Sequence, residues 1–316
     1  MKTSETRMHS PTPAIHAVGL ARRYGHIQAV SGLTLAVNRG EVLALLGPNG
    51  AGKTTTLSML TGTLAPHAGR IRIDGHDLGE APRQAKRALG YLPESPPLYP
   101  ELTVGEYLRF CARLHGMGRS TAREAAAAAA ARCGLESMNR RLIGHLSKGY
   151  QQRVGIAQAI VHRPAVVVLD EPTVGLDPVQ IRSTRELIRG LAASAAVIVS
   201  THLLNEAAEI ASRVVILAHG HIVHETTAET STLHLRMECV RPPAVDRLTR
   251  IAGISAVESG ENGSLLLTAD DANDPRPSLL AAAVAESWGL LALTPVRATL
   301  EDTFLAALAA NPEAEA

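Results

Sequence analysis

The sequence predicts an α/β fold built on a phosphate-binding loop, followed by a small C-terminal α+β domain of the ferredoxin-like type. The apolar run Val42–Leu46 leads directly into the glycine-rich segment GPNGAGKTT at residues 47–55. Further short apolar runs later in the chain are typical of strands buried on both faces of a parallel sheet. After residue 226 the predicted elements follow the order strand, helix, strand, strand, helix, strand.

The first part of the chain has the pattern of a nucleotide-binding core. Residues 1–13 are polar and contain prolines, which is typical of a loose tail. Strands are expected at 15–20, 33–37, 42–46 and 70–74, and the helix after the loop at 54–61. The pattern is helical over 103–135, which includes an alanine run, and again over 148–161. Strands at 165–169, 196–200 and 214–218 complete the predicted sheet, which is mainly parallel.

The C-terminal part, 227–316, is predicted to be a separate accessory α+β domain. Its expected strands lie at 233–240, 254–258, 264–268 and 290–295, with helices at 244–252 and 276–288. This order is that of the ferredoxin-like motif. A last helix at 300–310 carries apolar residues at helical spacing, which is most often a packing surface.

Composition excludes several classes of protein. The chain has 31 basic and 30 acidic residues and a net charge of +1, so we expect no nucleic-acid partner. Its three cysteines are far apart and form no CxxC pair, which argues against a disulfide framework or a zinc cluster. No run approaches the roughly 18 apolar residues that span a bilayer, and residues 1–13 do not resemble a signal peptide. Another chain would have to hold this one at a membrane.

The glycine-rich segment fits the P-loop pattern, in which backbone N–H groups converge on phosphate oxygens. Lys53 supplies a positive charge for the outer phosphates, and the Thr54 hydroxyl is a candidate Mg²⁺ ligand. The helix that begins near Gly52 directs its positive end at the anion. The candidate nucleotide-binding residues in this loop are Gly47, Pro48, Asn49, Gly50, Ala51, Gly52, Lys53, Thr54 and Thr55.

Two acidic residues end the predicted strand at 165–169. Asp170 is expected at the carboxyl end of a strand beside the loop, where it would hold Mg²⁺. Glu171 follows it and is the candidate general base that polarises a water for attack on the γ-phosphate. The alternative interpretation is that Asp170 and Glu171 are two solvated acidic residues at a strand end with no catalytic role. The P-loop beside this strand argues against that interpretation.

Three further segments resemble the ATP-binding subunits of ABC transporters: LSKGYQQRVGIAQA at 146–159, LDEPTVGLDP at 169–178 and STH at 200–202. The resemblance covers about 15–226 with five motifs in the family's order. It implies an ABC ATP-binding domain at 14–226 with a helical subdomain at about 95–163, and ATP and Mg²⁺ as cofactors.

The resemblance also implies roles for single residues. Tyr24 matches the aromatic residue that stacks on adenine. Ser147 and Gly149 match the signature groups that close over the γ-phosphate held by the opposite subunit of a head-to-tail homodimer. Residues 175–177 match the D-loop, and His202 matches the histidine that contacts the γ-phosphate and is assigned here as catalytic. A lone tyrosine or histidine at such positions would otherwise indicate ordinary packing or surface polarity.

The sequence departs from the family pattern at three positions. Lys148 and Tyr150 stand where the signature motif usually has glycine and glutamine, and Glu94 stands where the Q-loop usually has glutamine. A carboxylate at Glu94 still offers oxygen to Mg²⁺, but its charge would change the electrostatics of the metal. The effects of these three replacements stay open.

The GYLPE and LSKGY segments and the closing TLEDTFLAAL resemble exporters of the drug, polysaccharide and gliding-motility group, most closely the gliding-motility type. The resemblance implies an ATPase at the cytoplasmic face of the cell membrane that drives a separate polytopic permease, contacted through the Q-loop region near 95–102. Two alternatives stay open: a non-transport ABC ATPase acting on nucleic acid or ribosomes, and a regulatory scaffold that binds ATP without hydrolysing it. The transported substrate and the role of the C-terminal domain are not predicted.

Overall fold

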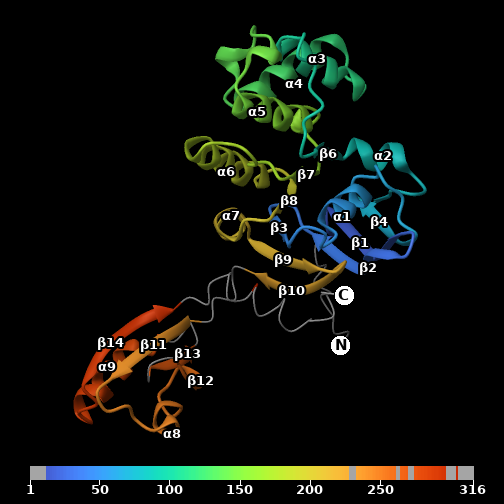
Figure 1. Ribbon diagram of the computed structural model, residues 1–316. Coiled ribbons are helices and arrows are strands. Elements are labelled where there is room, and N and C mark those ends of the chain that lie inside the picture. The colour runs from blue at the N-terminus through green and yellow to red at the C-terminus, as the bar shows by residue number, and fades with distance from the viewer. Residues whose placement is uncertain (1–11, 228–232, 261–263, 270–273, 297–303, 305–316) are drawn as a thin grey trace, which may run out of the picture. The chain divides into compact units, whose positions relative to one another are not determined.

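The computed structural model describes residues 12–227, 233–260, 264–269, 274–296 and Phe304. These residues belong to two compact units, one reaching to Thr227 and the other lying within residues 228–309 (Figure 1). The predicted tail at 1–13 lies almost wholly outside the described residues. The predicted helix at 300–310 does so too, apart from Phe304.

The centre of the first unit is a six-stranded sheet in the order β10-β9-β3-β8-β7-β6. Its strands are β3 (Val42–Leu46), β6 (Leu89–Leu92), β7 (Val166–Asp170), β8 (Ala196–Thr201), β9 (Arg213–Ala218) and β10 (His221–Thr227). Only β10 runs antiparallel to its neighbour. Every residue of β3, β7 and β8 is buried, as expected for strands covered on both faces. The predicted mainly parallel core sheet is therefore confirmed.

The strand register brings the loops that follow three of these strands to one edge of the sheet. Leu46 at the end of β3 pairs with Thr201 at the end of β8, and Asp170 at the end of β7 pairs with Ser200. The P-loop, Glu171 and His202 come directly after these strand ends. Parallel pairing thus gathers residues from distant parts of the sequence into one place.

A second, antiparallel sheet in the order β2-β1-β4-β5 belongs to this unit, and its strand β2 contacts the helix that follows the P-loop. It consists of β1 (Ile15–Tyr24), β2 (Ile27–Val37), β4 (Ala68–Ile73) and β5 (His76–Asp77). Strands β1 and β2 are longer than predicted because they continue to a tight turn at Gly25, whose φ is +56°. This extension places Tyr24 at the tip of the hairpin.

The helices of the first unit are α1 (Lys53–Leu60), α2 (Pro82–Arg87), α3 (Val104–Leu114), α4 (Arg119–Arg132), α5 (Lys148–Ile160), α6 (Pro178–Ala192) and α7 (Leu204–Ile210). Helices α3, α4 and α5 lie together at one end of the unit (Figure 1). Thr103 and Glu106 form a capping box that fixes the start of α3. The helical pattern predicted over 103–135 is divided between α3 and α4 by a turn at Gly116, whose φ is +85°.

The second unit has the predicted element order. Its sheet runs β12-β13-β11-β14, all antiparallel, from β11 (Leu233–Cys239), β12 (Ile254–Ser259), β13 (Leu265–Ala269) and β14 (Leu290–Val296). Helix α8 (Val245–Leu248) is shorter than the predicted 244–252. Helix α9 (Arg276–Ala285) ends before the predicted 288, because Ser287 takes a left-handed φ of +54°. Trp288 packs in the core of this unit with Leu235 and Leu279.

Candidate nucleotide site

The P-loop depends on glycine at three positions. A Cβ atom at Gly47 would lie 2.5 Å from the carbonyl oxygen of Leu217, and one at Gly52 would lie 2.5 Å from that of Ala29. Gly50 and Gly52 also have positive φ angles of +82° and +99°. Gly52 is the N-cap of α1, so the loop ends where the unpaired N–H groups of a helix begin. The segment therefore has the backbone geometry of an anion-binding loop.

Lys53 lies folded over this loop. Its Nζ donates to the carbonyl oxygens of Gly47 at 2.6 Å and Pro48 at 3.1 Å. Burial lowers the pKa of Lys53 below its ordinary value, while the nearby carboxylates of Glu171 and Asp170 act in the opposite direction. The amino group is thus a positive charge held between the loop and the acidic ends of the neighbouring strands.

Asp170 is 3% exposed at the end of β7. Ser200 on the adjacent strand donates from its Oγ to Asp170 Oδ1 and accepts from the backbone N–H of Glu171 at 2.9 Å. Burial raises the pKa of Asp170, and the charge of Glu94 raises it further, while the Ser200 hydroxyl and Lys53 lower it. Ser200 therefore fixes both acidic residues relative to β8.

Glu171 and His202 are in direct contact. The Oε2 atom of Glu171 lies 2.9 Å from Nδ1 of His202. The Glu171 side chain is 13% exposed and that of His202 is 46% exposed. Glu171 takes a left-handed backbone φ of +47°, which is uncommon for a residue with a side chain. The pair combines a nearly buried carboxylate with an imidazole that reaches solvent.

Several of these residues line one cavity of about 510 Å³, although Gly47 and Asp170 are not among its lining residues. It is lined by Tyr24, Ala29, Pro48, Asn49, Gly50, Gly52, Lys53, Thr54, Thr55, Glu94, Glu171, Val174 and His202. The structure thus brings together the P-loop, the candidate base, the Q-loop carboxylate and the histidine. A larger hollow of about 680 Å³ lies on α3 and α4 and contains none of the predicted site residues.

Tyr24 lies at the tip of the β1-β2 hairpin and is 47% exposed. The guanidinium carbon of Arg22 lies 5.3 Å from the centre of its ring, a cation–π distance. Arg22 in turn donates from its Nη1 to the carbonyl oxygen of Ala65 at 2.9 Å. The ring is therefore supported while a large part of it stays open to the solvent.

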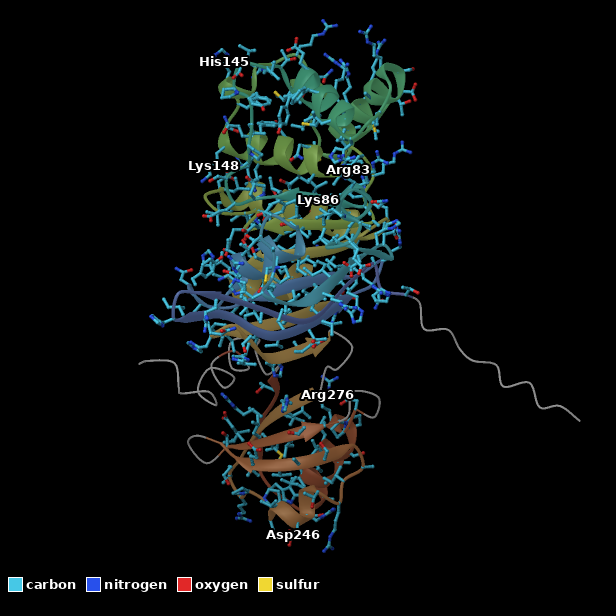
Figure 2. The ribbon with its side chains drawn as sticks, turned by 90° about the vertical axis from the view of Figure 1, so that its right-hand side faces the viewer. Arg83, Lys86, His145, Lys148, Asp246 and Arg276 are labelled. Atoms are coloured by element: carbon cyan, nitrogen blue, oxygen red, sulfur yellow. The ribbon has the colours of Figure 1, made fainter. Side chains whose placement is uncertain are left out.

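The signature residues are not part of this cavity. Ser147 is the exposed N-cap of α5, and Gly149 is buried against the side chain of Gln180. Lys148 is exposed at the edge of the unit (Figure 2), with its amino group over Gly175 of the D-loop segment. Asp177 caps α6 by accepting from the N–H groups of Val179 at 3.0 Å and Gln180 at 2.9 Å. The signature motif and the D-loop segment therefore contact each other within one chain.

The oxygen groups at and beside the cavity suit a hard divalent cation that arrives with phosphates. Glu94 and the exposed hydroxyl of Thr54 line the cavity, whereas Asp170 is buried and is not among the lining residues. Mg²⁺ is usually bound by one or two carboxylates together with phosphate oxygens and water. Within the described ranges, no group of three or more His, Cys, Asp or Glu side chains is placed to hold a metal ion. The described part of the chain also contains no helix long and apolar enough to cross a bilayer.

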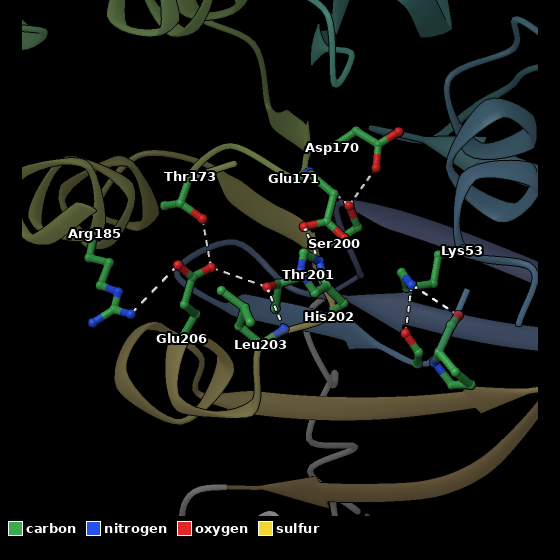
Figure 3. Close-up of polar contacts among 12 residues, drawn as sticks. Lys53, Asp170, Glu171, Thr173, Arg185, Ser200, Thr201, His202, Leu203 and Glu206 are labelled. Atoms are coloured by element: carbon green, nitrogen blue, oxygen red, sulfur yellow. Dashed lines mark hydrogen bonds and ion pairs between the residues drawn. The ribbon is translucent and has the colours of Figure 1, made fainter. Parts of the chain in front are cut away.

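A second set of polar residues beside the cavity is not predicted by the sequence patterns. Thr173, Thr201, Arg185 and Glu206 form a largely buried network next to the Glu171–His202 pair (Figure 3). The Ser200 hydroxyl was also given no role. Residues 200–202 were recognised as a motif, and the pairing of neighbouring strand ends would have predicted the contact from Ser200 to Asp170. Glu206 has no comparable signal, because a buried glutamate in a short polar helix resembles a surface residue in the sequence.

Comparisons with known proteins identify the family to which this fold belongs. A family model described as ABC transporter matches residues 30–174. An uncharacterized ABC transporter ATP-binding protein of Bacillus subtilis (strain 168), YdbJ, is 33% identical over 304 residues, which cover 95% of this chain and 97% of that protein. The daunorubicin/doxorubicin resistance ATP-binding protein DrrA of Streptomyces peucetius is 35% identical over 283 residues, covering 86% of this chain and 85% of that protein.

Among solved structures, a dimeric structure of MJ0796, a bacterial ABC transporter cassette, matches with a TM-score of 0.61 and 26% identity. The match covers 67% of this chain and 98% of that chain.

Proposed function

The chain belongs to the ATP-binding subunits of ABC transporters, and we propose that it hydrolyses Mg-ATP in the P-loop cavity to drive export through a separate membrane permease. Membership of this family makes the chain an ATPase. The proposal concerns the residues that bind and hydrolyse ATP, the dimer in which they act and the membrane permease that is driven by hydrolysis.

The observation that carries the proposal is the contact between Glu171 and His202 at the mouth of the P-loop cavity. A carboxylate here can accept a proton from a water that attacks the γ-phosphorus, while the bond to the β–γ bridging oxygen breaks and ADP leaves. His202 orients the carboxylate through Nδ1, which leaves its other ring nitrogen to hydrogen-bond the γ-phosphate. Glu171 is therefore the proposed base and His202 the proposed phosphate contact.

The remaining residues of the cavity bind the nucleotide in this scheme. The N–H groups of the loop at 47–55 and the start of α1 hold the phosphates, and Lys53 neutralises the outer ones. Tyr24, supported by Arg22, stacks on adenine. Thr54, Asp170 and Glu94 would hold Mg²⁺, which supplies charge neutralisation on the β- and γ-phosphates when bound.

A second copy of the chain completes the site in this proposal. Ser147 and Gly149 lie outside the cavity of their own chain. Ser147 is exposed at the start of α5, where the helix end favours an anion. We place these residues over the γ-phosphate bound by the opposite subunit in a head-to-tail dimer. The dimeric cassette among the structural matches supports this arrangement.

The permease is proposed to contact the segment at 95–102, which connects Glu94 to α3. Tyr99 is 45% exposed there, and its ring packs edge-on against Tyr107 and Phe110 of α3. The Tyr107 hydroxyl donates to the carbonyl oxygen of Pro97 at 3.0 Å. These contacts tie the segment to α3 within the helical subdomain proposed for 95–163, so that motion of this subdomain reaches the permease. This partner would hold the chain at the cytoplasmic face of the membrane.

Replacing Glu171 with Gln tests the proposal directly. Glu171→Gln keeps the size of the side chain and a hydrogen bond to His202 but removes the base, so we expect turnover to fall by about 10²-fold or more. Binding of Mg-ATP, measured by fluorescence of an ATP analogue, should stay within about threefold of the original. Glu186→Gln, on the exposed side of α6, is the matched control and should hydrolyse ATP normally. Normal phosphate release by Glu171→Gln would remove Glu171 from the role of base.

A further inference from the structure

Glu206 is a buried carboxylate that joins two separate segments of the nucleotide site. It lies in the first turn of α7 and is 2% exposed. Its Oε2 atom accepts from the hydroxyl of Thr173 at 2.6 Å and from the hydroxyl of Thr201 at 3.1 Å (Figure 3). Thr173 is 4% exposed and Thr201 is fully buried. One oxygen atom thus connects the loop after β7 to the end of β8.

The two threonines stand close in the chain to the proposed hydrolytic residues. Thr173 is two residues beyond Glu171, and Thr201 directly precedes His202. Thr201 Oγ1 also accepts from the N–H of Leu203 at 3.0 Å, so the backbone on both sides of His202 is fixed. The left-handed backbone at Glu171 persists only when the surrounding structure holds it. Glu206 therefore anchors both segments whose separation sets the contact between Glu171 and His202.

Stability of the fold does not account for a carboxylate at this position. Its nearest cation, Arg185, lies 3.6 Å from Oε1 and makes a closer ion pair of 2.6 Å with Glu209. Among the described residues, no group donates a hydrogen bond to Oε1. A buried carboxylate with a cation at this distance often stabilises a fold no more than well-packed apolar residues of similar volume would. What the carboxylate provides here is an acceptor that takes two hydroxyl hydrogen bonds at one fixed point.

We propose that Glu206 is a positioning residue for ATP hydrolysis, which sets the geometry of Glu171 and His202 through the hydroxyls of Thr173 and Thr201. It is buried and is not among the residues that line the cavity. This inference rests on the proposed function, because it takes Glu171 as the base and His202 as the phosphate contact. Misplacement of a reacting group by about 1 Å is enough to lower a rate by about 10²-fold.

The test measures ATP turnover by the full-length chain after substitution of Glu206 and, as a control, of Glu209 on the same helix. Glu206→Ala removes the acceptor, and we expect kcat to fall by about 10- to 100-fold while KM for ATP changes by less than about threefold. Glu206→Gln keeps an oxygen acceptor for both hydroxyls, so its kcat should stay within about threefold of the original. Glu209→Gln alters the other carboxylate bound to Arg185 and should leave kcat unchanged.

Loss of folding alone would give a different result. A purely structural role predicts that kcat follows the folded fraction, with equal losses for Glu206→Ala and for a variant destabilised to the same extent away from this network, such as a truncation of the buried Ile188 in α6. Equal losses would overturn the proposal. A kcat for Glu206→Ala within twofold of the original would overturn it as well.

Two further variants keep the proposal testable if Glu206→Ala does not fold. Thr173→Val and Thr201→Val keep the side-chain shape and each remove one hydroxyl donor to Glu206. Each should lower kcat by about tenfold with little change in KM. Full activity of both valine variants would overturn the proposal.

The failure of this inference can be distinguished from failure of the proposed function. Glu171→Gln is measured in parallel with the Glu206 variants. If Glu171→Gln hydrolyses ATP normally, the proposed base is wrong and the positioning role falls with it. If Glu171→Gln is inactive and Glu206→Ala is fully active, only the positioning role is overturned.

Discussion

The two sides of the nucleotide cavity are built in different ways. On one side, the P-loop at 47–55 holds its shape through backbone conformation, with glycine at the positions where a Cβ would collide or φ is positive. On the other side, Asp170, Glu171 and His202 hold their places through side-chain contacts to Ser200 and to each other. The first side is contained in nine consecutive residues, whereas the second joins strands whose contact residues lie 30 positions apart in sequence.

This difference indicates a division of tasks. A loop made of backbone N–H groups binds phosphate in almost any sequence that permits its conformation, and so it serves affinity. A set of side chains fixed to one another serves chemistry, because the distance between a base and its water determines the rate. Substitutions on the loop side should mainly change nucleotide binding. Substitutions on the carboxylate side should mainly change turnover.

The largest effect on nucleotide affinity is expected for Gly52→Ala, on the loop side. The φ of +99° is strained for alanine, and the new Cβ would lie 2.5 Å from the carbonyl oxygen of Ala29. Backbone strain of this kind costs about 1 to 3 kcal/mol, so affinity for Mg-ATP should fall by about 10- to 100-fold. Isothermal titration calorimetry of the purified chain measures this change.

The matched control is Gly190→Ala in α6. This glycine is exposed and has no atom near its Cβ position. Alanine is favoured over glycine at a helix interior, so this variant should bind ATP normally and be slightly more stable. Unchanged nucleotide affinity in Gly52→Ala would contradict the proposed difference between the two sides of the cavity. The loop would then accept a side chain at a position where its backbone conformation is expected to require glycine.

A smaller effect is expected for Ser200→Ala, on the carboxylate side. The serine hydroxyl stabilises the charged form of Asp170, so its loss should raise the pKa of Asp170 above a value that burial already raises. Asp170 would then be protonated at a higher pH, and the acidic limb of the rate profile should shift toward neutral pH. At neutral pH kcat should fall by about tenfold, in line with one lost hydrogen bond to a charged group.

The measurement is phosphate release between pH 5 and pH 8, with nucleotide binding in the absence of Mg²⁺ as the reference. Binding should be unchanged, because the P-loop does not depend on Ser200. A variant that loses affinity and keeps its rate profile would show that Ser200 supports the loop instead of the acids.

The same division explains what could be predicted from the sequence. The P-loop, the apolar strands β3, β7 and β8 and the helical pattern that begins at residue 103 depend on neighbouring residues, and their patterns are visible directly. Helix α6 was not predicted, because its amphipathic stretch follows directly on the motif at 169–178. The network at Glu206 depends on residues 33 and 5 positions away that meet only after the sheet has formed. Patterns of hydrophobicity carry no information about such contacts.

The smallest effect concerns another side-chain contact that the sequence does not predict, the stacking of His115 on His162. The two rings lie 3.6 Å apart at their centres and almost parallel, and His162 Nε2 donates to the carbonyl oxygen of Leu89 at 2.9 Å. Burial and the neighbouring His115 lower the pKa of His162 to about 4. Since an unfolded histidine has a pKa of about 6.5, the unfolded chain binds more protons between these two values. Stability from this residue is therefore complete above pH 6.5 and decreases as the pH falls toward 4.

Each pH unit in this window should cost at most about 1.4 kcal/mol of unfolding free energy. His162→Gln keeps a donor for Leu89 but does not titrate, so its thermal unfolding midpoint should fall less steeply between pH 6.5 and pH 4.5 than that of the original chain. His145→Gln is the control, because His145 is exposed at the surface (Figure 2) and should leave the slope unchanged. Equal slopes for His162→Gln and the original chain would show that His162 is protonated as easily in the folded protein as in the unfolded one. The stacked pair of histidines would then not contribute to the loss of stability at low pH. The pH dependence expected for Asp170 in the cavity would not extend to this side-chain contact outside it.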